Sequence, residues 1–250
     1  MEFDTIKYEN RLPPQFFEID RADIYYRNPY PWDHTISKLL VSLTGFPWKE
    51  SDRWHNRIKK RINKIHHKLD AVKYHIESFK THELKTETDY KNYIVANTTM
   101  NKIYDDPSLI YNFESFLFQS KSCMDVLAQI IAYSFKFETS TYRNKGDDLI
   151  KELKKIQNEN ASKVIGVIQG ARNWVNELVE MRDEVTHFSD LEGLSCFLTA
   201  QSKDTDEIVK VFYPSVPSGE RVSKYMDKTW TNVSHLISKC AQLLVDTAKK

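Results

Sequence analysis

Apolar residues recur at alternating spacings of four and three residues through the first third of the chain. This spacing places them on one side of a helix, as in the seam of a coiled coil. Ser51 supplies a side chain that can cap the helix start. We therefore expect a helix over 51–80 and a second over 87–104, in a coiled-coil-like hairpin. The apolar positions are Ile58, Ile62, Ile65, Leu69, Val72, Ile76 and Phe79.

A second apolar stripe begins after Asp106-Pro107, a pair typical of a helix start because aspartate caps and proline suits the first turn. The stripe runs from Phe113 to Phe135 and predicts a core helix. A polar stretch follows, and then a short amphipathic helix is expected over 149–157.

The same helical period predicts one long helix over 161–187. Gly166 and Gly170 lie one turn apart in it, and we expect them to allow close approach of another helix. The period then changes to the alternation of strands over 194–201 and 208–213, which predicts a β-hairpin. A final helix is expected over about 220–249.

The first 50 residues differ from the rest, since they hold five of the eight prolines and many aromatic residues. Prolines interrupt regular structure, whereas aromatic residues favour burial. We expect an irregular N-terminal arm over 1–50, with a short helix around 35–43, that packs onto a helical domain over 51–250. The fold class is thus mainly α, a helical bundle with long antiparallel helices and a small β-hairpin inserted before the C-terminal helix.

Composition narrows the function classes. The net charge is +1, so electrostatic binding must come from local patches. Three cysteines, far apart, argue against a disulfide framework or a cysteine zinc site. We find no secretory signal, membrane span or nucleotide-binding glycine loop. We therefore expect a soluble cytoplasmic protein that does not contact a membrane and needs no metal or cofactor.

One segment, Glu180–His187, combines charge with an apolar helix face. Arg182 falls on that face, seven residues after Val175 and three before Val185. A guanidinium there should pair with a carboxylate or point into a cleft. His187 follows five positions later, near the expected helix end. Arg182 and His187 can reach one site if the helix ends between them or a second subunit closes the cleft.

A motif late in the predicted helical domain resembles that of the HEPN superfamily. In this motif a polar residue follows an arginine directly, and a histidine follows four to six positions after it. Here the pattern is Arg182, Asp183 and His187. The helix after Pro107, with Ser122 and Asp125 among apolar residues, also looks like the first long helix of such domains. The resemblance covers roughly residues 107–250, and the hairpin would be an insertion in the helical pattern.

The resemblance implies a metal-independent endoribonuclease whose homodimer joins two Arg–His pairs into one composite site. By analogy, His187 would be the acid or base when the ribose 2′-hydroxyl attacks the phosphate. Arg182 would hold the phosphate, and Asp183 would orient one of the two. Such proteins serve in toxin–antitoxin or phage-defence settings, with RNA as substrate and an antitoxin as partner.

Other interpretations of the motif stay open. Arg61 and His66 also fit the spacing, but an apolar residue follows this arginine. Arg182 could form a buried ion pair with a carboxylate of another helix, while His187 only caps its helix. His66 and Asp70, one turn apart, could share a metal, although a solvated contact explains them as well.

The helix over 51–80 carries nine Lys/Arg residues against three acids. Such an excess could contact RNA phosphates, or it could be a solvated helix face. The candidate RNA-binding residues are Arg57, Lys60, Arg61, Lys64 and Lys68. A non-catalytic HEPN-like module that binds a partner protein, nucleotide or RNA is the main alternative function, and a scaffold that uses this basic helix is a third.

Overall fold

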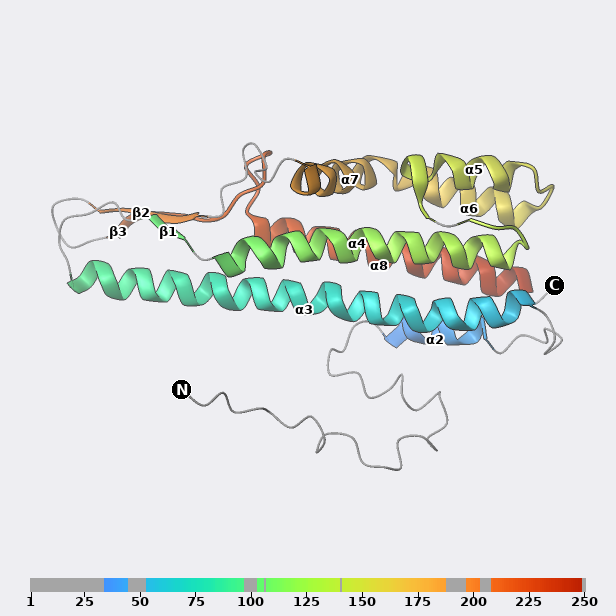
Figure 1. Ribbon diagram of the computed structural model, residues 1–250, viewed down its shortest axis with the longest axis horizontal. Coiled ribbons are helices and arrows are strands. Elements are labelled where there is room, and N and C mark those ends of the chain that lie inside the picture. Colours follow the sequence, from blue (N-terminus) through green and yellow to red (C-terminus); the bar gives the residue numbers. More distant parts are fainter. Residues whose placement is uncertain are drawn as a thin grey trace, which may run out of the picture. The chain divides into compact units, whose positions relative to one another are not determined.

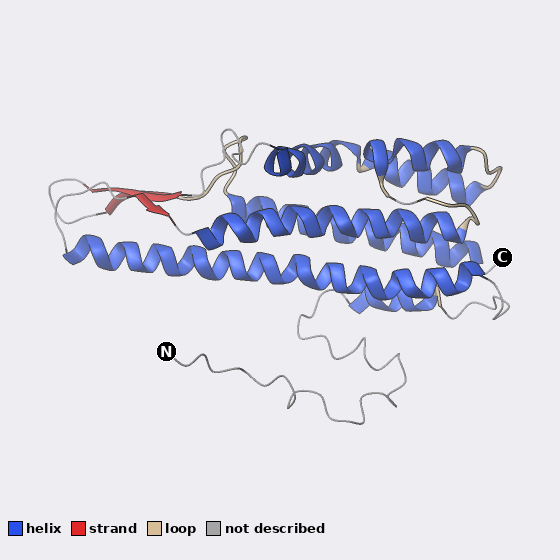
Figure 2. Cartoon of the chain, in the orientation of Figure 1, coloured by secondary structure: helices blue, strands red, loops and turns tan. Residues whose placement is uncertain are grey.

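The computed structural model describes residues 34–44, 53–96, 103–105, 107–139, 141–187, 197–202 and 208–248. Most of the expected N-terminal arm lies outside these ranges. The described elements all belong to one compact unit, Trp32–Lys250. Helices dominate this unit (Figures 1 and 2), so the expectation of a mainly α fold is confirmed. The helices are α2 (His34–Ser42), α3 (Arg53–Ala96), α4 (Pro107–Ser134), α5 (Asp147–Lys154), α6 (Glu159–Gly170), α7 (Arg172–His187) and α8 (Val222–Ala248), with a 3-10 turn η3 (Arg143–Gly146).

Helix α3 is one continuous helix of 44 residues, and the expectation of two helices over 51–80 and 87–104 is wrong. The seven apolar residues of its predicted seam are each at most 1% exposed. Beyond Phe79 the same spacing continues through Glu83 and Thr86, which are also buried. Because these two residues are polar, the hydrophobic pattern concealed that the helix continues.

The partner of α3 is α4, which runs antiparallel beside it (Figure 1). Polar contacts mark the register: Lys68 Nζ donates to Gln119 Oε1 at 2.9 Å, and His75 Nδ1 lies 3.1 Å from Asn112 Oδ1. The stripe expected on α4 is buried almost throughout, and the helix begins at Pro107 as predicted.

Helix α8 lies at the centre of the packing, in contact with α2, α3, α4 and α6. Its expected apolar face is buried from Val222 to Leu244, apart from half-buried Leu243. The short helix expected around 35–43 is confirmed as α2, and it packs chiefly on α8. The core is therefore built from segments taken from both ends of this unit.

Helices α5, α6 and α7 form a second layer over α4 and α8 (Figure 1). The expectation of one helix over 161–187 is wrong, since the chain turns at Ala171 between α6 and α7. Gly170, with its large conformational freedom, precedes this turn. Within the described part of this chain no helix approaches Gly166 or Gly170 closely, because a Cβ at either position would meet nothing within 4 Å.

Three short strands lie beyond the helical layers (Figure 2): β1 (Ile103–Asp105), β2 (Phe197–Ser202) and β3 (Ile208–Phe212). They pair antiparallel in the order β1-β2-β3, with Tyr104 opposite Leu198 and Ala200 opposite Val211. A register shift occurs at Gln201/Ser202.

The segment between β3 and α8 is fastened to α3 by a charged contact. The guanidinium of Arg221 donates to both carboxylate oxygens of Glu83, at 3.0 and 2.7 Å. The Glu83 side chain is only 3% exposed, and the Arg221 guanidinium lies 3.6 Å from the ring centroid of Tyr213. This hydrogen bonding to Glu83 raises the pKa of Arg221. It holds α8 in register with the far half of α3.

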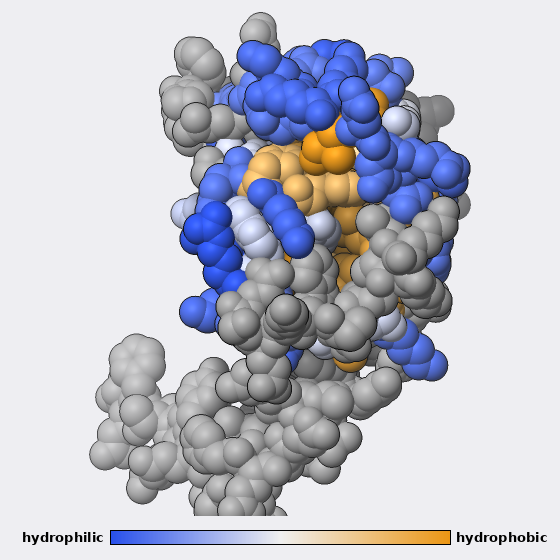
Figure 3. All heavy atoms as spheres, turned by 90° about the vertical axis from the view of Figure 1, so that its right-hand side faces the viewer, coloured by the Kyte–Doolittle hydropathy of each residue, from blue (hydrophilic) through white to orange (hydrophobic). Residues whose placement is uncertain are grey.

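The surface of the unit is largely hydrophilic, although apolar side chains reach it at the end on the right of Figure 1 (Figure 3). Among the residues whose burial the structure describes, the exposed large apolar side chains on α3 and α4 are Tyr74, Leu84, Tyr111 and Phe118. Scattered exposure of this kind is ordinary in folded proteins. Across the described residues, none of the helices combines the length and apolar character needed to cross a bilayer.

Candidate functional site

The sequence pointed to Arg182, Asp183 and His187, and all three belong to the last turns of α7. His187 is the final residue of the helix, and its side chain lies outside the described part of the structure. Arg182 and Asp183 line a hollow of about 440 Å³ between α7, α4 and the segment before α5. We call this hollow the α4–α7 pocket. Its lining residues are Lys121, Asp125, Thr141, Tyr142, Lys145, Val179, Arg182 and Asp183.

Asp125 joins the two sides of the α4–α7 pocket. Its Oδ1 accepts a hydrogen bond from the backbone N–H of Tyr142 at 2.7 Å. The same oxygen accepts from Lys121 Nζ, one turn earlier on α4, at 2.5 Å. A carboxylate that accepts from both a backbone amide and an ammonium is well fixed. The polar floor of the pocket is therefore preformed.

The tight turn after Tyr142 brings Lys145 to the pocket edge. Gly146 has a φ of 93°, which side-chain-bearing residues rarely adopt. A Cβ on Gly146 would also lie 2.8 Å from the ring of Tyr142. Tyr142 itself is 1% exposed, and this burial raises the pKa of its phenol. Glycine is thus required where the chain passes over the buried tyrosine and turns into α5.

Arg182 is one of the residues that line the α4–α7 pocket. Its guanidinium lies 3.0 Å from Asp183 Oδ1, and the two side chains are 25% and 46% exposed. This contact lies within one helix, because Asp183 follows Arg182 on α7, and Asp183 is half-exposed. A contact of this exposure contributes little to stability.

Three cationic and two anionic side chains line the α4–α7 pocket. Lys145 pairs with Glu180 at 2.7 Å, on the outer side of α7. Lys121, Lys145 and Arg182 come from three different elements and converge on one hollow. Such an arrangement suits an anion that carries several oxygen atoms, such as a phosphate diester.

Sequence reasoning missed Lys121, Tyr142 and Lys145 in the α4–α7 pocket. Two signals for them exist: Lys121 stands one turn before Asp125, and Lys145-Gly146 marks a tight turn. Neither signal says that these residues face α7, because that depends on how the two layers pack.

The rival pair, Arg61 and His66, lies inside α3. His66 is 6% exposed, and its burial, with a smaller effect of neighbouring His67, lowers its pKa to about 4. An imidazole that is buried and neutral at pH 7 is poorly placed for proton transfer with a substrate. No group of three or more His, Cys, Asp or Glu residues in the described ranges could hold a metal ion, so the arrangement around His66 and Asp70 gives no metal site there.

The five basic residues proposed for RNA binding do not share one environment. Arg57 forms an ion pair with Glu138, and Lys68 binds Gln119. Arg61 is half-buried, whereas Lys60 and Lys64 are exposed. Exposed Lys59 and exposed Arg53, whose guanidinium lies 4.5 Å from the centroid of the Trp54 ring, extend the basic patch. A phosphate backbone would therefore meet the stripe around Lys60 and Lys64 first.

Comparison with family models, characterised proteins and solved structures finds no match to this chain.

Proposed function

We propose that the chain is a HEPN-type, metal-independent endoribonuclease that acts as a homodimer in a toxin–antitoxin or phage-defence setting. The observation that carries this proposal is that Arg182 lines a polar pocket together with Lys121 and Lys145. Cations on three elements around one hollow are what a scissile phosphate requires as charge develops on its oxygen atoms.

In the proposed reaction the ribose 2′-oxygen attacks phosphorus and the bond from phosphorus to the 5′-oxygen breaks. His187 takes the proton of the 2′-hydroxyl, and an acid returns a proton to the leaving 5′-oxygen. The products are a 2′,3′-cyclic phosphate and a free 5′-hydroxyl. Arg182 stabilises the negative charge on the phosphate, while Asp183, 3.0 Å away, orients the guanidinium. Neither step uses a metal ion.

The test is cleavage of a labelled RNA by the purified full-length chain in the presence of EDTA. We expect Arg182→Ala to slow cleavage roughly 100- to 1,000-fold, as the loss of one charge-stabilising donor does in other enzymes. His187→Ala should slow it by a comparable factor.

The matched control is Arg172→Ala. Arg172 is also on α7, but it pairs with Asp147 outside the pocket, and both side chains are 49% exposed. This variant should cleave like the wild type. Equal activity of the Arg182→Ala and Arg172→Ala proteins, or activity lost on adding EDTA, would sink the proposal.

RNA contact by the basic stripe of α3 is tested separately, by measuring RNA binding at several salt concentrations. Lys60→Glu with Lys64→Glu should weaken RNA binding and flatten its dependence on salt, since fewer counterions are released. Binding that keeps the wild-type salt dependence would exclude this stripe as the RNA surface.

A non-catalytic binding module is the second candidate function. It is favoured by a groove between α6 and α8 of about 650 Å³, larger than the α4–α7 pocket. If RNA stays intact under every condition while a protein partner binds this groove, the module is the better description.

A further inference from the structure

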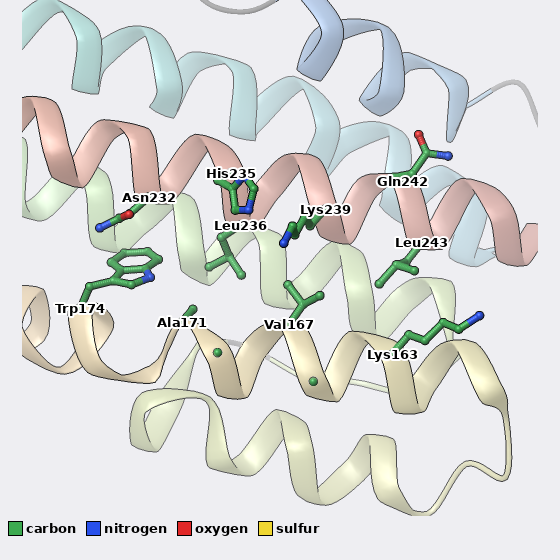
Figure 4. Close-up of a pocket in the computed structure, with 12 residues that line it drawn as sticks. Lys163, Val167, Ala171, Trp174, Asn232, His235, Leu236, Lys239, Gln242 and Leu243 are labelled. Atoms are coloured by element: carbon green, nitrogen blue, oxygen red, sulfur yellow. The ribbon is translucent and has the colours of Figure 1, made fainter.

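An open groove runs along the outer layer, between α6, the start of α7 and α8 (Figure 4). We call it the α6–α8 groove. Its lining residues recur every three or four positions on both sides, from Lys163 to Trp174 and from Asn232 to Leu243. Eleven residues of helix correspond to about 16 Å, or three turns. None of these residues lines the α4–α7 pocket, so the groove is a separate feature.

The floor of the α6–α8 groove is apolar. Val167 and Ala171 face Leu236 across it (Figure 4), and Ala171 and Leu236 are nearly buried. Gly166 and Gly170 lower one wall, because each has open space where a Cβ would stand. Trp174, half-exposed, projects toward Asn232 and closes one end (Figure 4). A tryptophan at the edge of an apolar groove is typical of a protein-binding anchor.

The rim of the α6–α8 groove is cationic. Lys239 and His235 stand on the α8 side, and Lys163 stands on the α6 side. Lys163 is held by Glu159 at 2.6 Å, in an exposed pair that competes weakly with a new partner. No aspartate or glutamate of the described chain lines the groove. Charge complementarity therefore favours an acidic occupant.

We propose that the α6–α8 groove receives an amphipathic helix with an acidic polar face, supplied by a partner protein. The helix lays its apolar side on Val167, Ala171 and Leu236, and its carboxylates meet Lys163 and Lys239. This is the helix-in-groove mode of recognition, in which anchors recur every three or four residues. A second copy of this chain fits less well, because symmetric pairing through the groove would bring basic rims together.

The experiment measures binding of labelled helical peptides to the full-length chain by fluorescence anisotropy. The probes are three acidic 18-residue peptides, each with a leucine face of a different width and glutamate at all other positions. Each has a twin peptide in which lysine replaces every glutamate. We expect at least one acidic peptide to bind more tightly than about 100 μM and tenfold more tightly than its twin, less so at high salt. If no acidic peptide binds, or if each twin binds equally well, the proposal is wrong.

Charge reversal tests the rim. The double variant Lys163→Glu with Lys239→Glu should exchange the preference, so that the lysine peptide binds and the glutamate peptide does not. Its matched control is Lys151→Glu with Lys154→Glu, an equal charge change at exposed positions on α5. The control should keep the wild-type preference. Equal effects of the two double variants would mean that net charge, and not the groove, governs binding.

Larger side chains at Gly166 test the low wall of the groove. Gly166→Leu should weaken acidic-peptide binding at least tenfold, whereas Gly166→Ala should leave it nearly unchanged. Both variants should fold, since the position is exposed and open. Equal binding by both would exclude the groove. A concentration-dependent dimer that Gly166→Leu dissolves would identify a second copy as the occupant and overturn the proposal. Neither result depends on RNA cleavage.

Discussion

At the scale of single residues, environment separates two segments that share one spacing of arginine and histidine. Arg182 is partly exposed and lines a pocket, whereas His66 is buried beside the apolar seam of α3. The spacing alone does not distinguish them, but the pattern around them does in part. An apolar residue follows Arg61, and a polar one follows Arg182. The position of Arg182 on its helix could be inferred, while the cations that surround it could not.

His66 predicts a pH dependence of stability. The unfolded chain binds a proton at His66 near its ordinary pKa, whereas the folded chain does so only near about 4. Protonation therefore favours the unfolded chain as pH falls from about 6.5 to 4, at a cost on the order of 3 kcal/mol. Replacing His66 by Phe should remove this part of the loss of stability between pH 7 and pH 4.5. The measurement is the free energy of unfolding in urea at the two pH values.

The control for His66 is His235→Gln, at an exposed position on α8. Carboxylates also titrate in this range, so the informative quantity is the difference between each variant and the wild type. A His66→Phe protein with the wild-type loss of stability would show that another group causes it.

At the scale of elements, the hydrophobic pattern predicted helix faces better than helix lengths. The seams of α3, α4 and α8 are buried as expected. The predicted length of α3 was wrong because the buried positions after Phe79 are Glu83 and Thr86. These residues are polar, so the apolar pattern does not include them. The break at Ala171 was also missed, since Gly170 alone does not say whether a helix bends or continues.

The contact between Glu83 and Arg221 predicts a stability effect between α3 and α8. Removing Arg221 leaves a nearly buried carboxylate without its bidentate partner, so Arg221→Ala should cost roughly 2–4 kcal/mol in the free energy of unfolding. Replacing both residues by leucine should recover most of that loss, because the buried charge is gone. Urea denaturation of the single and double variants measures this.

Lys80 and Asp227 supply the comparison, since they form a 2.8 Å ion pair between α3 and α8 close to the Arg221 contact in sequence but are 36% and 50% exposed. Lys80→Ala should cost less than about 1 kcal/mol. Similar costs for the two pairs would contradict the view that burial makes the Arg221 contact important.

At the scale of the whole molecule, the proposed nuclease predicts complementation between two inactive variants. A composite site needs an arginine and a histidine, and these can come from different copies. Arg182→Ala and His187→Ala proteins, each inactive alone, should regain part of the RNA cleavage when unfolded together and refolded. Mixed Arg172→Ala and His187→Ala proteins give the reference activity. If the first mixture stays inactive while mixed dimers form, the composite arrangement is wrong.

The class of the fold was predictable because helical periodicity is local, whereas the layer order was not. Lys121, Tyr142 and Lys145 join Arg182 only because α7 packs over α4, and that depends on contacts far apart in the sequence. The α6–α8 groove was concealed for the same reason. Gly166 and Gly170 were expected to allow close approach of another helix, and in the described chain they face open space.

The central position of α8 has a consequence for how the chain is made. Helices α2, α3, α4 and α6 all contact α8, yet α8 leaves the ribosome after every other described helix. The antiparallel pair of α3 and α4 can form during translation, but its exposed apolar side must wait for α8. Throughout that interval the nascent chain exposes the apolar side of α3 and α4 that α8 later covers, and a chain that ends before residue 222 lacks the α8 side of its core.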